Sequence, residues 1–245
     1  MSVIEKVIIC VVPDALGDPK VKAGDFPHID KLAKRGSCGF LATFADSNDL
    51  VNQLTGAHYH GVSSLEKVLG KMDLAVLKTT SAYGTKSDSE DDSESDGFGV
   101  VVNRSDDFLS QIDEMIHAHQ VVIVELDNIQ QADDVCNKFL PSIDTENIAL
   151  CIVAQYKQGH CPSIPIPPPC VHPSFKIVGP NVVESLTVDN VCLFLHASRR
   201  LTRIDHVQSF DETDIHENCC LGCMPICQLL REFSYYTGSS WKFGA

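Results

Sequence analysis

Apolar runs rich in β-branched residues recur along the first two thirds of the chain, with amphipathic segments between them. The runs at 4–12, 120–126 and 147–154 are almost continuously apolar, which is typical of strands buried on both faces of a parallel sheet. Apolar residues at helical spacing predict helices between the runs. The remaining expected elements are helices at 26–35, 62–69, 106–117 and 132–140 and strands at 38–43, 74–77 and 98–102.

The alternation of strand and helix predicts one α/β domain over residues 1–245, with a doubly wound, mostly parallel sheet and helices on both faces. The last third differs, because residues 159–173 are proline-dense and predict a loop or extended connection. After it the pattern predicts edge strands at 175–178 and 191–195 and a closing amphipathic helix over 219–236.

The net charge of the chain argues against some classes of binding partner. Lysine and arginine number 19 against 33 acidic residues, and the formal net charge is −14. That balance argues against nucleic acid or an anionic membrane surface as the main partner. No run approaches the roughly 18 to 20 apolar residues that a membrane-spanning helix needs. The first residues lack the basic region and small-residue cleavage site of a secretory signal, so we expect a cytoplasmic protein whose 11 cysteines stay reduced.

The acidic residues are concentrated in one segment. Residues 87–96 read SDSEDDSESD, with six acids and no base. Such a run buries too little apolar surface to offset its ordering entropy, so a disordered loop is expected at about 84–97. Ser87, Ser89 and Ser93 each have an acid three residues on, the pattern that acidophilic kinases accept. A phosphorylated loop and a solvated spacer both remain open.

The first candidate functional residue is Asp14, in the segment VVPDALGDP. Asp14, Asp127 and Gln155 each follow a predicted strand, and ligands in open α/β sheets bind at the carboxyl ends of strands. An acid there is a candidate metal ligand or part of a phosphate site, and its alternative role is to form the turn.

Several segments, taken in order, resemble the cofactor-independent phosphoglycerate mutases of the alkaline phosphatase superfamily. The opening VVPDALGD, the helix FPHIDKLAKRGSCGFL and the segment TFADSNDLVNQLTG follow the order of that family's first motifs. Weaker likenesses run on through IDEMIHAHQVVIVELDN, NIALCIVAQYKQGH, HCPSIPIP and CMPICQLLREFSYYTG. The resemblance implies an alkaline phosphatase-like fold.

The resemblance also implies a site with two divalent metals, Mn²⁺ or Zn²⁺, and a serine or threonine nucleophile. Three positions of this chain match that site. Asp14 and His160 match metal ligands, and Ser47 matches the nucleophile, which is also a ligand.

The other four ligand positions differ, because they carry Gln130, Asp134, Gln155 and Tyr156. Glutamine is a weak ligand for a hard cation, and tyrosine is protonated at neutral pH. Asp127 is a possible substitute ligand. The mutases also insert a substrate-clamping domain after the nucleophile, whereas here residues 54–56 run almost directly into the helix expected from 62.

The sequence therefore favours a degenerate, non-catalytic relative that acts through contacts with a protein partner and has no firmly predicted cofactor. The alternative is a metal-dependent phosphohydrolase or phosphomutase with Ser47 as nucleophile. A third possible function is binding of a small ligand or phosphate in the crevice at the strand ends, without catalysis.

Two further groups of residues have open interpretations. Cys220 and Cys223 form a CxxC that is capable of binding zinc, with Cys219 and Cys227 beside it. The resemblance instead places Cys223 and Cys227 on one face of the closing helix as small core residues. His58 and His60 alternate in AHYHG and share one face if that segment is extended.

Overall fold

The computed structural model describes residues 4–17, 24–44, 50–55, 72–78, 100–157, 160, 162, 165, 177–178, 181–182, 188–199, 204–219 and 221–239. The strands of the main sheet are β1 (Lys6–Leu16), β2 (Ser37–Phe44), β3 (Leu74–Lys78), β4 (Val100–Asn103), β5 (Val121–Glu125), β6 (Ile148–Tyr156), β9 (Val188–Ala197) and β10 (Cys223–Pro225). The helices are α1 (Pro27–Ala33), α2 (Leu50–Thr55), α5 (Phe108–Ala118), α6 (Ile129–Phe139), α7 (Ser142–Thr145), α8 (Glu212–Asn218) and α9 (Ile226–Tyr236). A separate two-stranded sheet pairs β7 (Ile177–Val178) with β8 (Asn181–Val182).

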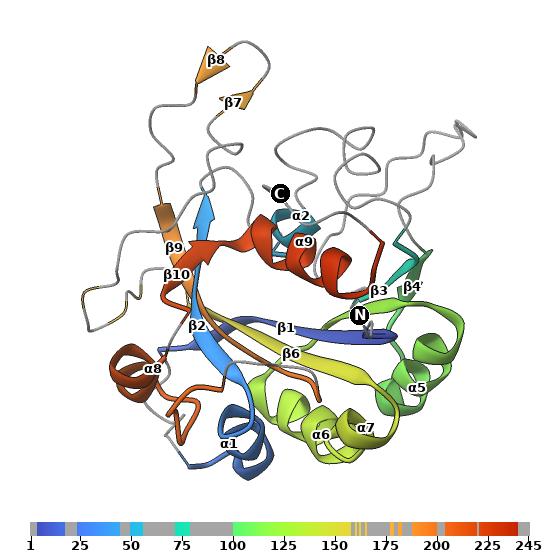
Figure 1. The fold of residues 1–245 in the computed structure, drawn as a ribbon. Helices are drawn as coiled ribbons and strands as arrows, with labels where there is room; N and C mark the ends of the chain where they lie inside the picture. The colour runs from blue at the N-terminus through green and yellow to red at the C-terminus, as the bar shows by residue number, and fades with distance from the viewer. Residues whose placement is uncertain are drawn as a thin grey trace.

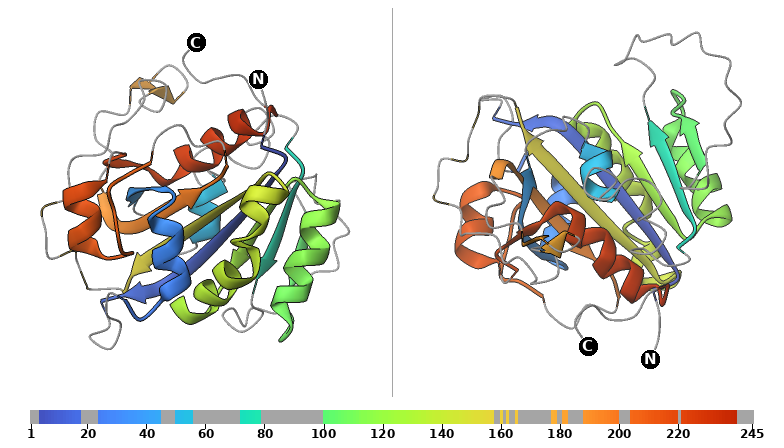
Figure 2. Two further views of the ribbon diagram at one scale, coloured as in Figure 1. Left: turned by 60° about the horizontal axis from the view of Figure 1, so that its bottom comes forward. Right: turned by 90° about the horizontal axis from the view of Figure 1, so that it is seen from above.

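The main sheet has eight strands in the order β10-β2-β9-β6-β1-β5-β3-β4 (Figure 1). Strand β9 runs antiparallel to both of its neighbours, whereas the other pairs in the sheet are parallel. The expected α/β class, with a mostly parallel sheet and helices on both faces, is confirmed (Figure 2).

Strand β1 lies in the middle of the sheet and is buried on both faces. Ile8, Cys10 and Val12 join a core cluster with residues of α1, α5, α6 and α8. Val7, Ile9 and Val11 join a second cluster with residues of α2 and α9. Successive side chains of a strand point to opposite faces, so a continuous apolar run is what a sheet covered on both sides requires.

The position of β9 corrects the prediction of an edge strand at 191–195. The strand is longer and lies inside the sheet, between β2 and β6. It pairs Cys192 with Leu41 of β2 and Leu193 with Ala154 of β6. In the described part of the chain the edge strands of this sheet are β10 and β4.

The closing helix predicted over 219–236 is also corrected. Residues 223–225 form β10, which pairs with β2, and α9 begins only at Ile226. Proline has no backbone N–H, which makes Pro225 unsuitable for a helix interior but acceptable at its boundary. The expected helix at 62–69 and the acidic loop at about 84–97 lie outside the described residues.

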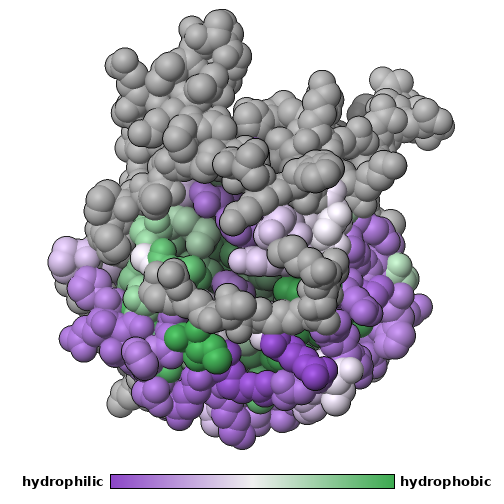
Figure 3. All heavy atoms as spheres, in the orientation of Figure 1, coloured by the Kyte–Doolittle hydropathy of each residue, from purple (hydrophilic) through white to green (hydrophobic). Residues whose placement is uncertain are grey.

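The surface over α5, α6 and α7 is mostly hydrophilic, whereas apolar side chains show toward the middle of the same view (Figure 3). Among the described residues, no helix is both long and apolar enough to cross a membrane.

Candidate functional site

Asp14 lies within β1 and not just past its end. The pairing of β1 with β6 shifts register between Val12 and Leu16, so Asp14 sits in an irregular part of the strand. Its φ is 51°, in the left-handed region that few residues other than glycine, asparagine and aspartate adopt. The irregularity leaves Asp14 exposed at the carboxyl edge of the sheet while Ala15 turns into the core.

His160 lies at the same edge as Asp14. The backbone N–H of Lys157 donates to the carbonyl of Leu16 (2.9 Å), and that of His160 donates to the carbonyl of Lys157 (2.9 Å). The imidazole of His160 packs on Gly17, where a Cβ would lie 3.0 Å from its ring atoms. Two of the three predicted site residues are thus brought to neighbouring strand ends. Ser47, the predicted nucleophile, lies outside the described residues, between β2 and α2.

Tyr156 occupies a position that the resemblance assigns to a metal-binding histidine. Its hydroxyl donates to Oε2 of Glu212 on α8 (2.8 Å), and only 4% of the residue is exposed. Burial, followed by the hydrogen bond to Glu212 and the negative charge of that carboxylate, raises the pKa of Tyr156 far above its ordinary value. The residue stays a neutral phenol that ties α8 to the end of β6.

Gln130 and Asp134 occupy two more of the resemblance's ligand positions, and both are exposed on α6. They are four residues apart, so they lie one helical turn from each other. The amide Nε2 of Gln130 donates to Oδ1 of Asp134 (3.3 Å). Gln130 and Asp134 thus form a hydrogen-bonded pair on the surface of α6.

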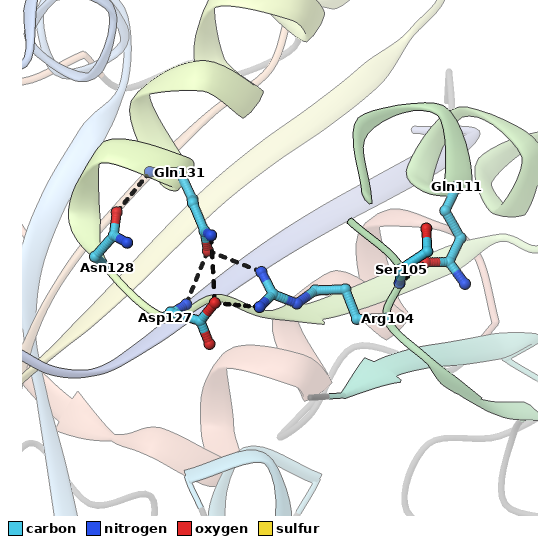
Figure 4. A network of polar contacts seen from close by, with 6 residues as sticks. All are labelled: Arg104, Ser105, Gln111, Asp127, Asn128 and Gln131. Atoms are coloured by element: carbon cyan, nitrogen blue, oxygen red, sulfur yellow. Dashed lines mark hydrogen bonds and ion pairs between the residues drawn. The ribbon is translucent and has the colours of Figure 1, made fainter. Parts of the chain in front are cut away.

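Asp127, the possible substitute ligand, belongs to a network with Arg104 and Gln131 (Figure 4). Arg104 follows β4, and its guanidinium forms an ion pair with Oδ2 of Asp127 and donates to Oε1 of Gln131 (2.8 Å). The Gln131 amide also accepts from the backbone N–H of Asp127 (2.9 Å) and donates to the Asp127 carboxylate (3.3 Å).

The Arg104 side chain is only 6% exposed and lies over the ring of Phe108, 5.5 Å from its centroid. An arginine held in this way supplies a permanent positive charge beside Asp127. The sequence interpretation missed Arg104. Its signal was a base two residues past the strand expected at 98–102, at the same sheet edge as Asp127.

The cysteines near the C-terminus are divided between elements. Cys223 lies on β10 and Cys227 on α9, so the expectation that one helix face carries both is wrong, although both are buried. Cys219 is half-buried and follows α8, while Cys220 lies outside the described residues. Burial raises the pKa of the thiols of Cys219, Cys223 and Cys227, which disfavours the thiolate that binds metal. Within the described ranges, no three histidine, cysteine, aspartate or glutamate residues are grouped as a metal site. His58 and His60 are outside those ranges.

Comparison with known proteins adds information on the fold. No protein-family model matches the chain, and no curated protein matches it. The solved structure of the PH0037 protein from Pyrococcus horikoshii is similar, with a TM-score of 0.62 and 13% sequence identity over 100% of each chain. At that identity the likeness shows a shared fold.

Proposed function

We propose that this chain is a non-catalytic relative of the cofactor-independent phosphoglycerate mutases, within the alkaline phosphatase superfamily, and that it acts through protein contacts. The observation that most strongly supports the proposal is the environment of Tyr156. At a position where the resemblance requires a metal-binding histidine, the side chain is buried, protonated and bonded to Glu212.

The surrounding positions support the same conclusion. Gln130 and Gln155 are neutral, and Gln130 is bonded to Asp134. Asp127 is balanced by the guanidinium of Arg104, which gives that carboxylate a positive partner from the protein itself. The residues present at this edge do not fit two divalent ions, and without the ions a serine hydroxyl lacks the activation it needs as a nucleophile.

Titration calorimetry with Mn²⁺ and with Zn²⁺ tests this proposal. We expect binding no tighter than about millimolar, the range of a site with few oxygen ligands. Two ions bound per chain with micromolar dissociation constants would contradict the proposal.

An activity assay is the second arm of the test. Wild type, Asp14→Asn and Ser47→Ala are compared for hydrolysis of an aryl phosphate with Mn²⁺ or Zn²⁺ added. Asparagine adopts the left-handed conformation of residue 14 readily, so the Asp14→Asn variant keeps the local fold. We expect all three proteins to give the rate of the buffer alone.

The alternative is a metal-dependent phosphohydrolase or phosphomutase. The observation that favours it is the placement of Asp14 and His160 at adjacent strand ends. Metal-dependent turnover in the wild type that is lost in both variants would replace the proposed function by this one.

A further inference from the structure

His196 is a buried titratable residue that the candidate site does not use. It lies on β9, is 8% exposed, and pairs across the sheet with Ser37 of β2 and Cys151 of β6. Directly paired residues of antiparallel strands share a face. Cys151 belongs to the core cluster under α2 and α9, so His196 faces α9.

Two aromatic rings enclose the imidazole of His196. Phe194, on the same strand, stacks with it at a centroid distance of 6.2 Å and an interplanar angle of 5°. Phe233 of α9 meets it edge-on, at 5.7 Å and 81°. Within the described part of the chain, neither ring nitrogen has a hydrogen-bond partner. The helix therefore packs on a polar ring whose two nitrogens are cut off from water.

The groups around His196 offer little compensation for a positive charge. Asp205 is the charged group that acts on the ring, and its buried carboxylate already accepts the backbone N–H of Cys38 at 2.6 Å. Cys151 is neutral, because burial raises the pKa of its thiol well above the ordinary value. Burial lowers the pKa of His196 to about 4, an effect that the charge of Asp205 only partly opposes.

We propose that His196 is an acid-sensitive latch for helix α9: the neutral imidazole lets Phe233 pack on the sheet, and a proton taken up by the ring releases the helix. Uptake of the proton requires that α9 lifts enough for water to reach the ring nitrogens. Acid therefore favours the lifted state, because a ring in water binds a proton at a higher pH than the enclosed ring does. This inference is independent of the proposed function.

Native-state hydrogen exchange of the full chain between pH 7 and pH 5 tests the latch. The opening equilibrium of α9 amides, corrected for the intrinsic pH dependence of exchange, should rise up to about tenfold per pH unit below pH 6.5, as expected for uptake of one proton. The opening equilibrium of α6, which lies on the opposite face, should stay constant. An equal rise in both helices, or no rise in α9, would overturn the proposal.

Two variants isolate the responsible histidine. His196→Phe keeps an aromatic ring between Phe194 and Phe233 but cannot be protonated, so α9 should open to the same extent at each pH. His216→Gln removes an exposed histidine of α8 and should behave like the wild type. A retained acid response in folded His196→Phe would refute the latch, and the comparison of α9 with α6 in the wild type decides the question if that variant does not fold.

Discussion

Gly36 lies where the chain passes from α1 into β2, directly against β9. A Cβ at this residue would lie 2.4 Å from the carbonyl oxygen of His196 and 3.1 Å from that of Leu32. Both neighbours are backbone atoms in packed elements, which have little freedom to move aside. The absence of a side chain at Gly36 is what allows α1 and β9 to approach this closely.

Replacing Gly36 by alanine should lower the free energy of unfolding by about 3 kcal/mol, the cost of overpacking against a rigid neighbour. Gly24→Ala is the matched control, because Gly24 has open space around it but a φ of 87°. That variant should lose only about 1 kcal/mol, from the left-handed conformation. Urea unfolding of both variants measures the difference, and equal losses would show that space at Gly36 is not limiting.

The hydroxyl of Tyr156 should stabilise the fold. Tyr156→Phe removes the bond to Glu212 and should lower the free energy of unfolding by about 1 to 2 kcal/mol, as for a buried hydrogen bond to a charged acceptor. Tyr236→Phe, at a residue that is 37% exposed, should change it by less than about 0.5 kcal/mol. Denaturant melts of the two variants make the comparison, and no loss in Tyr156→Phe would mean that the bond to Glu212 is not formed.

The sequence predicts correctly that Asp127 follows a strand, whereas Asp14 lies inside β1 and not past its end. It does not predict their partners. Glu212 is 56 residues from Tyr156 and Arg104 is 23 residues from Asp127, and local patterns carry no information about such contacts. A local pattern can therefore suggest a candidate site residue, but it does not show whether a distant segment already holds that residue in a hydrogen bond or ion pair.

Helix α1 depends on another helix for the cap that its own sequence lacks. Phe26 stands at its N-cap position and supplies no side-chain hydrogen bond. Oδ1 of Asp133, on α6, accepts the backbone N–H groups of His28 and Ile29, each at 2.9 Å, and Oδ2 lies 2.8 Å from the imidazole Nδ1 of His28. One buried carboxylate thus satisfies the first turn of α1 and joins the two helices.

Asp133→Ala should lower the free energy of unfolding by about 3 kcal/mol, because it leaves buried N–H groups without an acceptor. The neighbouring Asp134→Ala is a close control on the same helix. Asp134 is exposed, so its replacement should stay within about 0.5 kcal/mol of the wild type. Chemical denaturation measures both variants, and similar losses in the two would contradict the capping role of Asp133.

Buried parallel strands and the helices between them could be predicted well from the sequence. The expected elements at 120–126, 132–140 and 147–154 correspond to β5, α6 and β6 with shifts of a few residues at their ends. The interior place of β9 could not be predicted, because strand order depends on pairing between segments far apart in the chain. Helix α8 was not predicted because Ile215 is its one buried residue, so the segment shows no apolar repeat at helical spacing.

At the scale of the molecule, the sheet separates two layers of helices, each with its own core cluster. Strands β3 and β4 are parallel neighbours, with Ala75 opposite Val100, and the chain between them contains the acidic segment. A connection of this kind must run back along the length of β3 before it enters β4. The pairing of β3 with β4 therefore depends on the length of this connection and not on its charge.

Deleting residues 87–96 should leave the sheet intact, because the connection that remains is still long enough to join β3 to β4. The rest of 79–99 still spans up to about 36 Å, twice the roughly 17 Å that β3 covers. We expect a melting temperature within about 3 °C of the wild type, measured by thermal unfolding. A full-length variant with the six acids replaced by asparagine and glutamine separates charge from length. A large fall in the deletion but not in that variant would mean that length is limiting.

The central position of β1 has a consequence for synthesis of the chain. β1 leaves the ribosome before its neighbours in the sheet, because Val7 pairs with Val121 of β5 and Ala149 of β6, which lie much later in the chain. At about 5 to 20 residues per second, its partners emerge on the order of 10 s later. During that interval an apolar strand made for burial on both faces remains unpaired in the nascent chain. We expect β1 to be a binding segment for ribosome-associated chaperones, and slow refolding after dilution from denaturant to follow from the same long-range pairing.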